Sequence, residues 1–436
     1  MYVRTQHSGS PAAVDHSRDL RWRSSLFACF VVFGLSLATW VTRTPAIRDS
    51  VEASTAQMGL LLLGLSIGSM VGVLSSGPIV ARVGCRPVAV AGCASITLGM
   101  AVLTVGSGLG ASVGIFLGLM LFGLGMGLTE IALNIEGAAV EKALGRSVLP
   151  AMHGCFSLGT VIGAVGGILA TSQDVPPQWH LLTVTVIGVV LFVWALPGLP
   201  ARTGLRAAVA AQAIDGSATP ATARPPAGML QVLRRPTVIT LAVLLLGMAL
   251  AEGAANDWLP LIMVDGHGLD ATVGSLVFTG FAVAMTVGRF TGSWFIDRYG
   301  RGPVLQVGVI TAGVGIALVV FSPSPVLAGV AVLLWGLGAS LGFPVVVSAA
   351  GDHPTDSAAQ VSAVATAGYI AFLVGPPLLG LLGEHYGLRN AMLAVLALVV
   401  AAAVVTPRAM RTPVHDDGDA PTAYPATTPN PTQEVS

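Results

Sequence analysis

The side chains best placed to do chemistry in this sequence are a few acids and amides inside long apolar stretches. Glu130 and Asn134 lie four residues apart in one stretch, and Glu252 and Asn256 repeat this spacing in another. Residues four apart lie on the same face of an α-helix. An ionisable side chain at bilayer depth costs about 2.5–3.5 kcal/mol on insertion scales, so an acid kept there indicates a function.

The predicted chemistry of these acids is the reversible holding of a proton. Burial away from water favours the neutral form of a carboxylic acid, so a buried glutamate can keep a proton at neutral pH and release it when its cavity opens to a more alkaline side. We predict this proton-coupling role for Glu130, Glu252 and Asp257. The structural alternative is an ion pair of Glu252 or Asp257 with Arg289, which lies in the next apolar stretch.

Other side chains of the same stretches could contact a solute. Asn134 and Asn256 each offer donors and acceptors that suit a hydroxyl-bearing molecule, although either could instead hold two helices together. Arg289 could contact the solute or take part in the proton switch, or serve only as a counter-ion. Trp40 and Trp258 could stack on a solute, although Trp in such stretches is more often an anchor at the membrane interface. We therefore predict substrate contacts at these five residues.

His153 lies at the start of an apolar stretch, close in sequence to Glu136 and Glu141. We expect a satisfied interface histidine, paired with one of these two acids, in preference to a ligand.

The elements that must position these residues are membrane-spanning helices. Of the 436 residues, 54% are hydrophobic and 10% are charged, and the mean hydropathy is +0.80. So few charges could not cover the surface of a soluble protein of this size. With roughly 20 apolar residues needed per span, the sequence predicts an all-α membrane protein with twelve spans, near residues 23–42, 56–80, 87–106, 113–138, 150–171, 181–199, 237–262, 271–296, 303–321, 326–349, 359–383 and 388–406.

Polar segments divide the chain into two halves. A stretch rich in Arg and Pro interrupts the hydrophobic pattern after the sixth span, and a tail rich in Pro and Thr follows the twelfth. Such compositions are typical of linkers and disordered tails. We predict an N-terminal tail at 1–22, a six-helix bundle at 23–199, a linker at 200–236, a second six-helix bundle at 237–406 and a disordered tail at 407–436.

The basic residues predict the orientation in the membrane. With the N-terminus inside, seventeen Lys and Arg residues fall in inner segments and three in outer segments. Cytoplasmic loops carry the excess of Lys and Arg. We therefore predict that both termini and the linker are cytoplasmic. Twenty Arg to one Lys favours a bacterial source with a GC-rich genome, and hence a multi-pass protein of the bacterial inner membrane.

The two halves echo each other in sequence. The segment Gly77–Arg86 after the second span aligns with Ser293–Arg301 after the eighth, at a shift of 216 residues. Phe122-Gly-Leu-Gly125 in the fourth span aligns with Trp335-Gly-Leu-Gly338 in the tenth, at a shift of 213. Parallel repeats of six helices are a common transporter architecture, with the solute site between the halves near the midplane.

The repeated loop resembles the signature Gly-x-x-x-Asp-Arg-x-Gly-Arg loop of the major facilitator superfamily. The second copy keeps Asp297, Arg298, Gly300 and Arg301, with Ser293 in place of the glycine. In the first copy, Ala81 stands where the acid belongs and Cys85 where a basic residue is usual. The resemblance covers about residues 23–406 and implies the fold of that superfamily, two pseudo-symmetric bundles of six helices.

In that family the loop is a cytoplasmic gate. The resemblance therefore implies gating roles for Arg82, Asp297, Arg298 and Arg301. The alternative is that these arginines only anchor helices at the inner surface of the membrane.

The fourth span also resembles a branch of this family. Glu130 and Asn134 match the Glu-Thr-x-x-Asn element of the fucose-permease-like sugar–proton symporters. The resemblance implies a proton-coupling glutamate and an asparagine near the sugar. The first span lacks the acid of that branch, since no Asp or Glu lies between Trp22 and Thr42. That absence speaks against fucose as the solute.

Several patterns that look catalytic have a structural explanation. Gly64-Leu-Ser66-Ile-Gly68 fits a nucleophile elbow by letters, but it lies inside a predicted helix and not at a strand-to-helix turn. With Gly72 it predicts a stripe of small residues that lets helices approach closely. The sequence has neither a Walker lysine motif nor cysteines at metal-ligand spacing. We expect no enzyme activity, no cofactor and no metal ion.

The sequence thus predicts a secondary active transporter that moves a small polar solute by alternating access, with sugar–proton symport favoured. The alternative is a proton-driven exporter of drugs or secondary metabolites, and a receptor is the third class. Exporters of this superfamily usually carry an arginine in the fourth span and Gly-Pro in the fifth, whereas this chain has no arginine there and has Gly163-Ala164. The expected partners are the solute, protons and the lipid bilayer, with no nucleic acid, and we expect a monomer.

Overall fold

The computed structural model describes residues 11–144, 148–201, 203–205, 232, 234–352 and 357–410. Over these residues the chain is helical and contains no strand. Twelve of its helical stretches are long and apolar enough to cross a membrane. The expected all-α fold with twelve spans is therefore confirmed.

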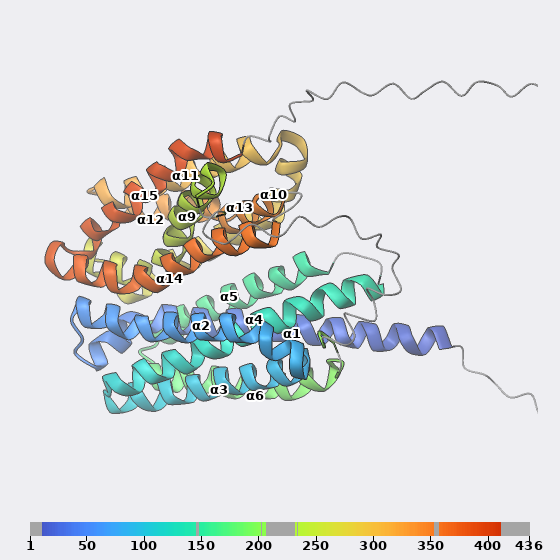
Figure 1. Ribbon diagram of the computed structural model, residues 1–436. Coiled ribbons are helices and arrows are strands. Elements are labelled where there is room, and N and C mark those ends of the chain that lie inside the picture. Colours follow the sequence, from blue (N-terminus) through green and yellow to red (C-terminus); the bar gives the residue numbers. More distant parts are fainter. Residues whose placement is uncertain are drawn as a thin grey trace, which may run out of the picture.

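The first half is built from six long helices, shown in blue to green in Figure 1. Their bounds are α1 (Pro11–Ser50), α2 (Thr55–Val83), α3 (Cys85–Leu109), α4 (Ser112–Leu144), α5 (Leu149–Ser172) and α6 (Pro177–Ala195), with the short turn η1 (Leu196–Gly198) after α6. Helix α1 begins at Pro11, so the second part of the predicted tail 1–22 is helical. The predicted linker is described at 200–201, 203–205, 232 and 234–236, and the rest of it lies outside the described residues.

The second half follows in yellow to red. Its helices are α9 (Pro236–Leu261), α10 (Ala271–Tyr299), α11 (Arg301–Phe321), α12 (Pro325–Ala339), α13 (Gly342–Gly351), α14 (Ser357–Tyr386) and α15 (Leu388–Ala409). A π-helical turn, η2 (Ile262–Gly266), extends α9. Of the predicted tail 407–436, residues 411–436 lie outside the described part of the chain.

The tenth span is broken, unlike the continuous helix expected at 326–349. Helix α12 ends at Ala339 and α13 starts at Gly342. Pro344 has no amide hydrogen to donate to the carbonyl of Ser340, and its ring disfavours a continuous helix through this turn. Gly336 and Gly338 just before the break further weaken the helix.

Glycines let helices of the first half pack with their backbones in contact. A Cβ built on Gly68 of α2 would lie 1.9 Å from the Met120 carbonyl oxygen of α4, and one on Gly123 of α4 would lie 2.1 Å from the Leu65 carbonyl oxygen. A Cβ on Gly64 or Gly72 would also lie too close to α4, at 2.6 Å and 2.5 Å from a carbonyl oxygen of that helix. The predicted small-residue stripe is thus the α2–α4 interface. In lipid the hydrophobic effect does not drive helices together. Helices there associate through close packing at interfaces of small residues such as this one.

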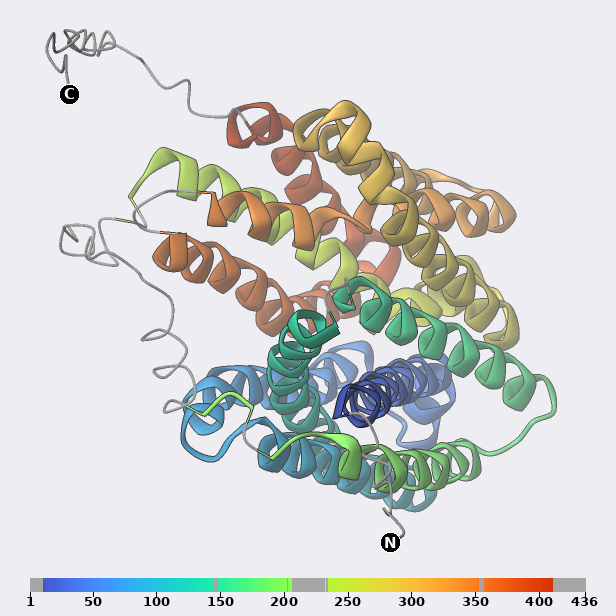
Figure 2. The same cartoon turned by 90° about the vertical axis from the view of Figure 1, so that its right-hand side faces the viewer.

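The two halves pack through α2 against α14, α5 against α10 and α1 against α9 and α10. Figure 2 looks along the bundle and shows the halves side by side. We call the two ends of the molecule the Arg48 end, where α1 joins α2 and α14 joins α15, and the Arg298 end, where α2 joins α3 and α10 joins α11. The Arg48 end is on the left of Figure 1.

Candidate functional site

An ion pair joins two helices of the second half. Arg289 of α10 donates from Nη2 to Oε1 of Glu252 on α9, at 2.8 Å. The side chains are 29% and 17% exposed, respectively. The alternative foreseen for these residues, a structural ion pair between neighbouring helices, is therefore present. The contact joins α9 to α10 through a carboxylate and a guanidinium.

Glu130 faces this pair from the first half. It lies well inside α4 and interacts electrostatically with Glu252 of α9 and with Tyr369 of α14. Its side chain is exposed to solvent. No Lys, Arg or His of the described residues forms an ion pair with it. Glu130 thus differs from Glu252 in having no cationic partner.

His153 of α5 approaches the same pair. Its ring packs edge-on against Phe30, with centroids 5.3 Å apart, and it interacts electrostatically with Arg289 across the interface between the halves. Glu141, one of the two acids expected to pair with His153, accepts from the amides of Val148 and Leu149 at the start of α5.

Glu136, the other acid expected beside His153, is fully buried, and its carboxylate lies near Trp22 and Thr203. We call Glu130, His153, Glu252, Arg289 and Tyr369 the central polar cluster. It draws on five helices from both halves.

Three further predicted residues lie on the same helices. Asn134 follows Glu130 by one turn of α4, and Asn256 and Asp257 follow Glu252 on α9. All three side chains are half-buried. None makes a side-chain hydrogen bond to another residue in the described part of the chain, so their polar atoms remain available to a solute or to water.

The two predicted tryptophans are placed differently from expectation. Trp40 is 0% exposed and Trp258 is 1% exposed, and the indole Nε1 of each has no hydrogen-bond partner. The reason is that α1 and α9 are the most enclosed of the twelve spans. In this conformation neither ring can stack on a solute, and neither reaches the lipid interface.

The predicted gate residues all lie at the Arg298 end. Arg298 stacks against Trp294 and Tyr299 of its own helix, with its Cζ 5.9 Å and 5.7 Å from the two ring centroids. Arg301 donates to Asp352 at the end of α13, at 2.5 Å. These contacts stay within the second half.

Arg82 and Asp297 are exposed and have no ion pair among the described residues. Among the described residues, none of the four predicted gate residues forms a hydrogen bond or ion pair with the opposite half.

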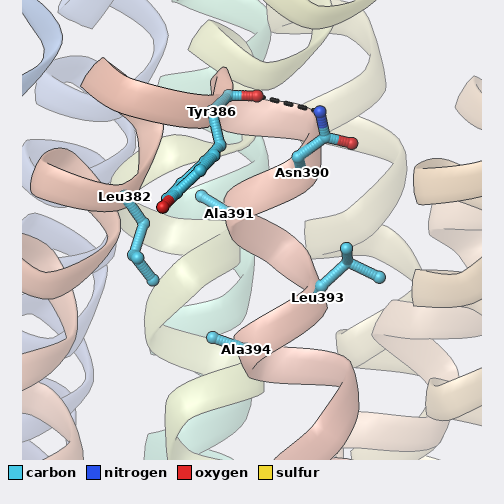
Figure 3. A pocket seen from close by; sticks show the side chains of 6 residues that line it. All are labelled: Leu382, Tyr386, Asn390, Ala391, Leu393 and Ala394. Carbon is cyan, nitrogen blue, oxygen red and sulfur yellow. Dashed lines mark hydrogen bonds between the residues drawn. The ribbon is translucent and has the colours of Figure 1, made fainter.

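A surface cavity lies apart from the cluster. A space of about 470 Å³ is lined by side chains of α14 and α15. Figure 3 shows these side chains, namely Leu382, Tyr386, Asn390, Ala391, Leu393 and Ala394. Asn390 donates from Nδ2 to the Tyr386 carbonyl oxygen at 2.8 Å. The cavity contains no residue of the central polar cluster and lies within one half.

Tyr369 and Asp352 were missed by the sequence analysis. Tyr369 lies in the eleventh span, and no spacing links it to Glu130, which lies far away in the chain. Asp352 directly follows α13, where a partner for Arg301 could have been sought.

Relatives of this chain are membrane transporters. A family model described as Major Facilitator Superfamily matches residues 250–429. An uncharacterised MFS-type transporter of Yersinia pestis is 30% identical over 376 residues, which cover 86% of this chain and 92% of that protein. Membrane protein MosC of Rhizobium meliloti is 26% identical over 381 residues, covering 86% of each chain.

Solved structures share the fold. The nucleoside transporter NupG has a TM-score of 0.69 at 14% identity, with 89% of this chain and 100% of that chain covered. The E. coli fucose:proton symporter FucP has a TM-score of 0.59 at 17% identity, with 89% and 98% covered. Two six-helix halves, the repeated loop and the relative at 30% identity agree, and this chain is a multi-pass membrane transporter that belongs to the major facilitator superfamily.

Proposed function

We propose that this protein is a proton-coupled symporter that moves a small polar, sugar-like solute by alternating access. The observation that carries the proposal is the central polar cluster, which joins acids, a guanidinium and a phenol from both halves inside apolar helices. Ionisable groups at this depth are expensive to keep and mark ion or substrate pathways.

Glu130 is the proposed proton carrier. It is accessible to solvent and has no cationic partner among the described residues, whereas Glu252 is held by Arg289. With Glu130 ionised, two carboxylates of opposite halves repel each other, and a proton on Glu130 removes that repulsion. Protonation thereby favours the approach of the halves. Glu252 and Asp257 remain proposed members of the proton pathway on α9.

Asn134 and Asn256 are the proposed solute contacts, since their amides can both donate to and accept from hydroxyl groups. Arg289 joins them through the guanidinium atoms that do not bind Glu252. Trp40 and Trp258 could reach a solute only in a conformation that uncovers them. A nucleoside transporter and a fucose:proton symporter among proteins of this fold support a panel of nucleosides and sugars as trial solutes.

The Arg298 end is the proposed cytoplasmic end, because the positive-inside rule places the basic loops there. Both termini then lie in the cytoplasm, and the protein resides in the bacterial inner membrane. Arg82, Asp297, Arg298 and Arg301 are the proposed inner gate. The stacking of Arg298 on Trp294 and Tyr299 also supports a role as anchor at the inner membrane interface.

Solute-dependent proton movement in vesicles tests this proposal. Purified protein is reconstituted, each sugar or nucleoside of the panel is added, and external pH is recorded. Symport predicts that the medium becomes alkaline as the solute enters. Proton movement in the opposite direction would establish the exporter instead. The absence of solute-dependent proton movement and of solute flux over the whole panel would overturn the proposed symport.

A further inference from the structure

At the Arg48 end, the two halves are joined by contacts between residues that lie outside the signature loops. Arg48, in the last turn of α1, forms an ion pair with Asp265 of η2 in the opposite half. The same guanidinium also binds Asp49 of its own helix, at 2.9 Å. The side chain of Arg48 is 16% exposed and that of Asp265 is 31% exposed, so the bridge between the halves lies where water can reach it.

A second contact caps a helix across the same interface. Glu384, in the last turn of α14, accepts a hydrogen bond from the amide of Ala56 at 3.0 Å. Ala56 lies in the first turn of α2, where amides have no partner within the helix. Ser54 already caps Gln57 within the first half, with the Gln57 side chain returning the bond. One first-turn amide of α2 is thus satisfied by its own half and another by the opposite half.

Two glycines bring the backbones together beside this cap. A Cβ built on Gly380 of α14 would lie 2.8 Å from the Gly59 Cα of α2, and 3.0 Å from the Thr55 carbonyl oxygen. One built on Gly59 would lie 2.9 Å from the Pro376 carbonyl oxygen. Any side chain at either position would therefore force α2 and α14 apart. The halves can reach this separation only because both positions are glycine.

We propose that Glu384, Asp265 and the Gly59–Gly380 contact form a releasable gate at the Arg48 end. Here Glu384 serves as a helix cap for α2 that is present when this end is closed and lost when it opens. The inference takes alternating access from the proposed function. A cap and an ion pair suit a gate because water replaces both once the halves separate, so the closed and open states differ by little free energy.

Thiol labelling of a residue sealed by this gate tests the proposal. Ser275 of α10 is 0% exposed and donates to the Thr42 carbonyl oxygen of the opposite half, at 3.1 Å. Ser275→Cys is introduced after the four native cysteines are replaced by alanine, and the protein is placed in nanodiscs. A membrane-impermeant maleimide then reports how often this end opens.

Glu384→Ala should increase the labelling rate about fivefold, the shift expected from losing one helix cap. Asp265→Asn should also increase it. Ser324→Ala is the matched control, since Ser324 caps Leu327 within the second half at 3.3 Å. Glu52→Ala is the control for charge, because Glu52 is exposed at the same end and its side chain forms no hydrogen bond or ion pair within the described chain. Both controls should label at the parent rate.

Gly380→Ala provides a test that does not depend on Glu384. It should raise the labelling rate at least as much, whereas Gly77→Ala should not, because a Cβ on Gly77 meets nothing within 4 Å. An unchanged rate in Glu384→Ala and Gly380→Ala, or an equal increase in the controls, would overturn the gate. Labelling needs neither solute nor a proton gradient, so failure of the proposed symport would leave this result intact.

Discussion

At the scale of single residues, the membrane-embedded acids divide into two kinds. Glu252 has a guanidinium partner at 2.8 Å, and Glu130 has no cation in contact among the described residues. The sequence did not distinguish the two acids, because each lies four residues before an asparagine. Only the fold shows that α10 brings Arg289 to one of them. For this reason the proposed function assigns the exchanging proton to Glu130, whereas Glu252 is paired with Arg289.

Removing Arg289 alone should destabilise the protein more than removing the charges of both Arg289 and Glu252. Arg289→Met leaves the Glu252 carboxylate half-buried and unpaired, and should lower the free energy of unfolding by about 2 kcal/mol. The double variant Glu252→Gln, Arg289→Met should recover part of this loss, because no charge is left without a partner. Thermal unfolding of the purified protein measures both, with Arg298→Met as control. A double variant less stable than Arg289→Met alone would contradict the description of the pair.

His267 should make stability depend on pH. Its Nε2 lies 3.0 Å from the Val319 carbonyl oxygen, where a protonated nitrogen donates. Burial lowers the pKa of His267 below its ordinary value, and the nearby Arg389 lowers it further, against the hydrogen bond to Val319. The folded state therefore binds this proton less readily than the unfolded state. The contribution of neutral His267 is present above about pH 6.5, the ordinary value, and declines as the pH falls below it.

The unfolding temperature measured at pH 7.5 and at pH 5.5 tests this prediction. His267→Gln can still donate to Val319 but cannot take up a proton, so its unfolding temperature should fall less between the two pH values than that of the parent. Equal declines in the two proteins would show that His267 does not contribute.

At the scale of helices, the glycine positions were predictable and the break in the tenth span was not. The stripe Gly64, Gly68 and Gly72 follows from a spacing of four, and the structure places it against α4. Proline alone does not signal a break, since Pro45, Pro78, Pro260 and the pair Pro376–Pro377 all lie inside continuous helices. At Pro344 the preceding glycines weaken the helix as well. Whether a helix weakened in this way breaks depends on the packing around it.

The α2–α4 contact should tolerate no side chain at Gly123. Gly123→Ala would place a Cβ 2.1 Å from the Leu65 carbonyl oxygen, so the two backbones must separate. We expect a loss of about 1–3 kcal/mol, as for overpacked cores. Gly77→Ala, on the open face of α2, should be neutral. Equal thermal stability of the two variants would contradict the close approach described for α2 and α4.

At the scale of the whole molecule, the internal repeat predicted two halves of six spans, and the family comparison agrees with them. Which end of the interface is closed could not be predicted, because that property belongs to one conformation. Glu384 and Ala56 are far apart in the sequence, and nothing in their surroundings links them. The predicted gate at Asp297 and Arg298 lies at the opposite end, where Arg298 packs on Trp294 and Tyr299 of its own helix.

The central claim is that Glu130 carries the proton that drives uphill transport. Reconstituted vesicles can separate solute exchange, which needs only alternating access, from accumulation, which also needs a coupled proton. For a solute that the parent transports, Glu130→Gln should abolish accumulation driven by a pH gradient while retaining exchange at a measurable fraction of the parent rate. Normal accumulation by Glu130→Gln would contradict the account.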